Sequence, residues 1–113
     1  MKPLKKPVDV NALRIVMQYF RRDVRVCELE CAGASLALHI SNPGDAPRGS
    51  EWLIEAHGKH SGGEIVIAES RTTRHLALLA VGDAWGAKGP GLGLHPFDWG
   101  AVASVLKAVR IID

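Results

Sequence analysis

The chain has 113 residues, of which 47% are apolar and 23% are charged, and its net charge is +2 with neutral histidines. These values are typical of one globular domain and exclude a mainly disordered chain. The mild positive charge neither demands nor excludes an anionic partner. Since no apolar run approaches the ~20 residues that cross a bilayer, we predict no membrane partner.

The N-terminal region combines a basic segment with a helical pattern. Residues 1–8 contain three lysines and two prolines, which predicts a flexible basic arm. Residues 9–113 then form a single α+β domain. Over residues 9–22 an aspartate suited to capping a helix precedes apolar residues at helical spacing, which predicts a first helix. The buried stripe of this helix would be Val10, Leu13, Val16, Met17 and Phe20.

Alternating apolar and polar residues predict four strands in the middle of the chain. The clearest pair is residues 24–31 and 35–41, joined by Ala-Gly-Ala as a hairpin turn. A loop rich in proline and glycine separates them from residues 51–57 and 64–69, which form the third and fourth strands.

Residues 70–86 fit two structures. Their many leucines and alanines, and the cap-forming Thr72 and Thr73, favour a helix over a fifth strand. Residues 86–97 contain four glycines and two prolines and read as an irregular loop. Asp98 is expected to cap a last helix over residues 98–111.

These elements predict an α+β fold: a four-stranded antiparallel meander sheet, or a five-stranded one as the alternative, with N- and C-terminal helices packed on one face. The helices would bury Leu36, Leu38 and Ile40. The opposite face would stand in water. Its side chains would be Glu28, Glu30, His39, Glu55 and His57.

The two cysteines indicate the redox state of the chain. Cys27 and Cys31 on one strand would lie about 13 Å apart, farther than a disulfide allows. We therefore expect two reduced thiols and a cytoplasmic location. We predict no metal ion and no cofactor, because Cys27 would point into the core while His57 points to the other face.

No motif specifies a reaction, so we predict a small non-enzymatic binding or regulatory module that acts through protein–protein contact or self-association, as in a homodimer. Apolar side chains on the outer sheet face or in the late loop would bind the partner. The candidate partner-binding residues are Leu53, Val66, Trp85, Lys88 and Leu92.

Two other functions stay open. Clustered basic residues favour nucleic-acid binding. The residues involved would be Lys5, Lys6, Arg21, Arg22 and Arg25. The third function is a metal-dependent or acid–base enzyme that uses the glutamates and histidines of the outer sheet face.

Overall fold

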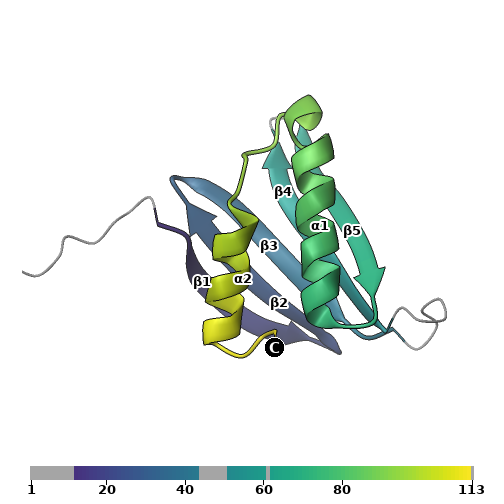
Figure 1. Ribbon diagram of the computed structural model, residues 1–113. Coiled ribbons are helices and arrows are strands. Elements are labelled where there is room, and N and C mark those ends of the chain that lie inside the picture. The colour runs from purple at the N-terminus through teal and green to yellow at the C-terminus, as the bar shows by residue number, and fades with distance from the viewer. Residues whose placement is uncertain (1–11, 44–50, 61, 113) are drawn as a thin grey trace, which may run out of the picture.

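A computed structural model describes residues 12–43, 51–60 and 62–112 (Figure 1). The α+β class and the antiparallel meander are confirmed, but the sheet has five strands rather than four. Each strand pairs with the next along the chain, so β1 and β5 form the two edges. The strands are β1 Arg14–Arg21, β2 Val24–Cys31, β3 Ala34–Ser41, β4 Trp52–His60 and β5 Gly63–Arg71.

The predicted first helix is wrong, because strand β1 occupies most of residues 9–22. Three residues of the expected buried stripe are exposed, Val16 by 47%, Met17 by 54% and Phe20 by 67%. A bulge between Ile15 and Met17 adds one residue to the strand, so its exposed apolar side chains fall at intervals that imitate a helix. Pairing with β2 then outweighs the weak local helix preference. The predicted arm, residues 1–8, and its lysines lie outside the described residues.

The central hairpin and its buried face are confirmed. Strands β2 and β3 pair through the turn at Ala32 and Gly33, whose φ angles of 51° and 80° are both left-handed. Leu36, Leu38 and Ile40 are each at most 3% exposed. The two sheet faces are therefore the ones that the alternating pattern predicts.

The helical alternative for residues 70–86 is confirmed. Helix α1 spans Arg74–Lys88 and begins where Thr73 Oγ1 accepts a hydrogen bond from the Leu76 amide at 3.1 Å. A short 3₁₀ turn, η1 Pro90–Leu92, follows it inside the predicted loop. Helix α2 spans Trp99–Ala108, with the Asp98 carboxylate capping its first turn as expected.

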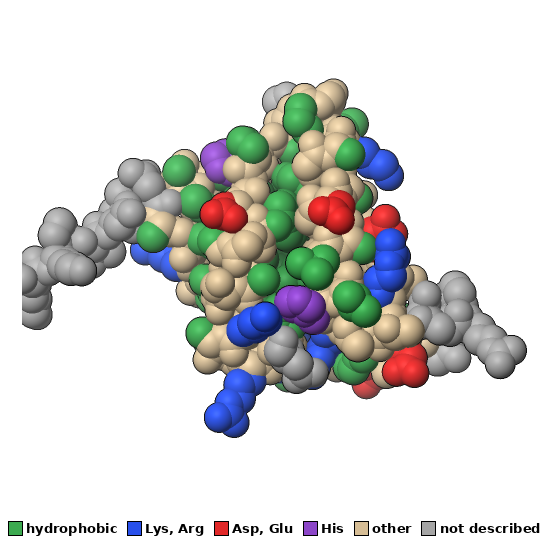
Figure 2. Space-filling model, viewed as in Figure 1, with side chains coloured by type: hydrophobic (Ala, Val, Ile, Leu, Met, Phe, Trp, Pro, Cys, Tyr) green, Lys and Arg blue, Asp and Glu red, His purple; other side chains and the backbone are tan. Residues whose placement is uncertain are grey.

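Both helices cover the same face of the sheet, α1 over β4 and β5 and α2 toward β1 (Figure 1). Hydrophobic side chains fill the space between them (Figure 2). At the centre Trp85 is 2% exposed, and its Nε1 donates to the His95 carbonyl at 2.9 Å. Leu94 and Phe97 of the predicted loop also join this core. Across the described ranges, neither helix has the length and apolar character to pass through a bilayer.

Burial of Cys27 links stability to alkaline pH. Both cysteines are thiols, and burial raises the pKa of the Cys27 thiol from 9.0 to about 11. The folded state therefore holds this proton more tightly than the unfolded chain does. The resulting stabilisation is complete below the unfolded pKa and is lost as the pH rises through the folded pKa.

We expect the free energy of unfolding to fall by roughly 3 kcal/mol between about pH 9 and 11 through this one thiol, at about 1.4 kcal/mol per pKa unit. Denaturant titrations of wild type and Cys27→Ala at several pH values would measure it. Other titrating groups are common to both proteins, so equal pH dependence in the two would show that the buried thiol has no such effect.

Candidate functional site

The sheet face opposite the helices, called the open face below, carries the polar side chains that the sequence predicted there. Register places His39 of β3 opposite Glu55 of β4, and His57 opposite Val66 of β5. On β2, Glu28 and Glu30 are half-buried on the same face. The open face therefore brings carboxylates and imidazoles together within three neighbouring strands.

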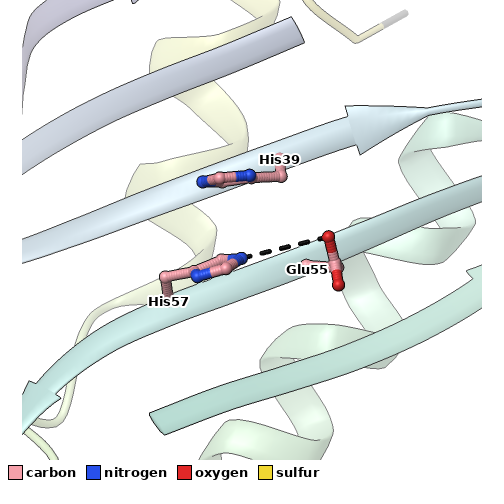
Figure 3. Close-up of side chains that lie close together, drawn as sticks. All are labelled: His39, Glu55 and His57. Atoms are coloured by element: carbon pink, nitrogen blue, oxygen red, sulfur yellow. Dashed lines mark ion pairs between the residues drawn. The ribbon is translucent and has the colours of Figure 1, made fainter. Parts of the chain in front are cut away.

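His39, Glu55 and His57 form a compact group, shown in Figure 3 and called the histidine cluster below. The rings of His39 and His57 stack with centroids 3.9 Å apart and planes inclined by 20°. His57 Nε2 lies 3.9 Å from Glu55 Oε1. The three candidate donor atoms all lie within 4.8 Å of one another.

Glu64 on β5 sets the proton position on His57. His57 Nδ1 lies 2.8 Å from Glu64 Oε1, and an ionised carboxylate can only accept a hydrogen bond. The hydrogen bond from His57, and then its charge, lowers the pKa of the Glu64 carboxyl group, so this carboxylate is ionised near neutral pH. His57 Nδ1 is therefore the donor, and in the neutral ring Nε2 is left with a lone pair.

His39 is held neutral beside it. Burial, followed by the neighbouring charge of His57, lowers the pKa of the His39 imidazole. Two rings stacked this closely do not both carry a positive charge at neutral pH. The cluster therefore offers an imidazole lone pair on His39, whose ring stacks on that of His57.

A groove of about 380 Å³ gives access to this region. His57 and Glu64 line it, together with Met17 from β1 and Glu28 from β2. His57 itself is only 16% exposed, whereas Glu55 is 39% exposed. Neither Glu55 nor His39 lines the groove, so a small solute entering it meets the histidine cluster at His57.

No family model, curated protein or solved structure matches this chain.

The second candidate site is the edge strand β1. Val16, Met17 and Phe20 place three exposed apolar side chains on a single eight-residue strand. One side of this strand pairs with β2, and in the described part of the chain no strand pairs with the other side. Natural sheets usually protect such an edge with charges or prolines. Here the charges stand at its two ends, Arg14 and Arg21.

The predicted partner-binding residues do not form one surface. Leu53 and Val66 do lie on the open face, with Val66 44% exposed. Lys88 ends α1 and Leu92 lies in η1. The prediction that Trp85 binds a partner needs correction, because the structure buries this side chain in the core.

Only some of the basic residues predicted to bind nucleic acid lie near one another in the described structure. Arg21 and Arg22 are exposed at the β1–β2 turn, and the guanidinium of Arg25 lies 5.5 Å from the centre of the Phe20 ring. The remaining members, Lys5 and Lys6, lie outside the described residues.

Sequence reasoning missed the β1 edge altogether. The signal was present, because Ile15, Val16, Tyr19 and Phe20 are residue types that favour strands.

Proposed function

We propose that this protein is a small non-enzymatic binding module that self-associates through strand β1, in the cytoplasm as its two thiols suggest. The observation that carries the proposal is the exposure of Val16, Met17 and Phe20 along a sheet edge that pairs with no other strand among the described residues. An edge strand with apolar side chains pairs readily with another strand, since the backbone groups gain partners while the side chains leave water.

Self-pairing is compatible with the alternation of β1. Met17, Tyr19 and Arg21 lie on the open face, while Gln18 and Phe20 lie on the helix-covered face. A twofold axis through Tyr19 would pair each residue with one on the same face, as an antiparallel ladder requires. The bulge near Val16 limits the pairing segment to residues 17–21.

The charges near β1 also favour a second copy of this chain as the binding partner. In that register Arg21 of one copy would lie opposite Met17 of the other, and Met17 is itself paired with Glu28. The long arginine side chain can cross Met17 toward that carboxylate. Arg14 already pairs with Glu30 at 3.1 Å, so it brings little repulsion to the interface.

The test is the oligomeric state of a variant with two polar substitutions on β1. Wild type should form dimers whose fraction rises with concentration, and Met17→Glu/Phe20→Ser should be monomeric, because it removes apolar contact and places a new charge at the edge. Sedimentation at several concentrations measures this. We expect the dimer dissociation constant to rise by about 30-fold or more, the equivalent of roughly 2 kcal/mol.

Leu76→Ser/Leu79→Ser is the matched control, because these α1 side chains are 46% and 45% exposed but lie away from β1. A wild type that stays monomeric at high concentration, or a control that dissociates equally, contradicts the proposal.

Nucleic-acid binding is the alternative function. It would be supported if wild type bound generic RNA or DNA with steep salt dependence and lost this on substitution of Arg21, Arg22 and Arg25.

A further inference from the structure

The histidine cluster contains two acceptor atoms that face each other. His57 Nε2 is buried and has no hydrogen-bond partner among the described residues. Its nearest charged neighbour is Glu55 Oε1 at 3.9 Å. In the neutral His57 ring, whose proton lies on Nδ1 against Glu64, the Nε2 lone pair points toward the Glu55 carboxylate. A buried acceptor without a donor is costly, so a cation between these two atoms would stabilise the arrangement.

The donor atoms have the chemistry of a transition-metal site. Two imidazole nitrogens and one carboxylate oxygen form the ligand set of many zinc sites that keep an open coordination position. Glu64 adds the outer partner usual for a metal-bound histidine, since it accepts from Nδ1 and so directs Nε2 toward the metal. The face is not covered by either helix (Figure 1), so water or a solute could complete the coordination.

We propose that His39, Glu55 and His57 bind one divalent transition-metal ion of the zinc class, with Glu64 as a positioning residue. This site is independent of the β1 interface, and neither proposal needs the other.

Binding requires a small rearrangement of side chains. The donor atoms lie up to 4.8 Å apart, whereas ligands about 2.0–2.1 Å from a tetrahedral ion lie roughly 3.4 Å apart. A metal also lies close to the plane of each imidazole that binds it, and the two rings now stack. Rotation of the His39 ring about its side-chain bonds would bring its nitrogen toward Nε2 of His57 and Glu55 without moving the strands.

The experiment is a zinc titration of the untagged full-length chain after removal of metals by a chelator, followed by calorimetry. Wild type should bind one ion per chain. His39→Gln, Glu55→Gln and His57→Gln should each weaken binding by at least tenfold. Glu64→Gln should weaken it by about 10–100-fold, as expected for an outer partner.

His75→Gln and Glu51→Gln are matched controls, because His75 lies on α1, over the other face, and Glu51 precedes β4 outside the cluster. Both should bind zinc as wild type does. Circular dichroism checks that each variant is folded, and zinc should raise the melting temperature of wild type but not of His57→Gln.

Nitrogen NMR reads the two rings directly. On zinc addition the ring signals of His39 and His57 in wild type should shift together. In metal-free Glu64→Gln the His57 ring should lose its preference for a proton on Nδ1. No binding at millimolar zinc, unchanged affinity in His57→Gln, or shifts confined to other histidines would each overturn the proposal.

Discussion

Replacement of Trp85 by alanine is expected to lower the free energy of unfolding by about 3–5 kcal/mol, the usual range for a buried large aromatic side chain. The indole is 2% exposed and lies 5.8 Å from the Phe97 ring and 5.6 Å from the Trp99 ring, measured between centroids. Its Nε1 also donates to the His95 carbonyl. Removing it would leave a cavity where α1 meets the segment leading to α2, and one carbonyl would lose its donor.

Urea unfolding followed by circular dichroism measures this loss. Trp85→Phe should fall between wild type and alanine, because it keeps a ring but loses the Nε1 donor. Leu92→Ala is the control, since this side chain is 39% exposed and its loss should change stability by less than about 0.5 kcal/mol. A Trp85→Ala protein within 1 kcal/mol of wild type would mean that the ring does not hold the helices to the sheet.

Gly58→Ala is expected to destabilise the protein by about 1–3 kcal/mol, because the site has no room for a methyl group. Gly58 is buried on β4 under α1. A Cβ atom there would overlap the far edge of the Trp85 ring and lie 3.0 Å from Leu94 Cδ2. The ring is held by its own hydrogen bond and cannot withdraw without disturbing the core.

Gly86→Ala is the matched control, with the opposite sign. Gly86 lies within α1, and a Cβ atom built there meets nothing within 4 Å. Alanine should therefore stabilise the helix by about 0.5–1 kcal/mol. Thermal unfolding of the two variants decides between these directions, and a Gly58→Ala protein as stable as wild type would contradict the packing of Trp85 on β4.

The central part of the fold could be predicted because local pattern and tertiary environment agree there. The alternation of Leu36, Leu38 and Ile40 matches a sheet with one covered face, and Thr73 and Asp98 do cap the two helices. Residues 14–21 could not be predicted in this way. Their apolar spacing reflects a bulge in an exposed edge strand, and what decides their structure is pairing with the next strand, β2, which local helical spacing does not reveal.

The residues of the histidine cluster were predicted to share a face, but their mutual contact was not. Alternation shows that His39, Glu55 and His57 point to the same side, whereas the pairing of His39 with Glu55 depends on the register between β3 and β4. These strands are separated by residues 42–51 in the sequence, too many for the two-residue turn that would fix the register. The hydrogen bond from His57 to Glu64 depends on the register between β4 and β5.

The most direct test of self-association through β1 is oxidative cross-linking of Tyr19→Cys in a Cys31→Ala background. Cys27 can stay, because it is buried and its thiol pKa is about 11. In the proposed register the two Cys side chains face each other across the twofold axis, with Cα atoms about 4.5–5.5 Å apart, within reach of a disulfide. We predict rapid formation of a disulfide-linked dimer, whereas Leu79→Cys in the same background should cross-link slowly. A Tyr19→Cys protein that stays monomeric under oxidation, or that cross-links no faster than the Leu79→Cys protein, would contradict the account.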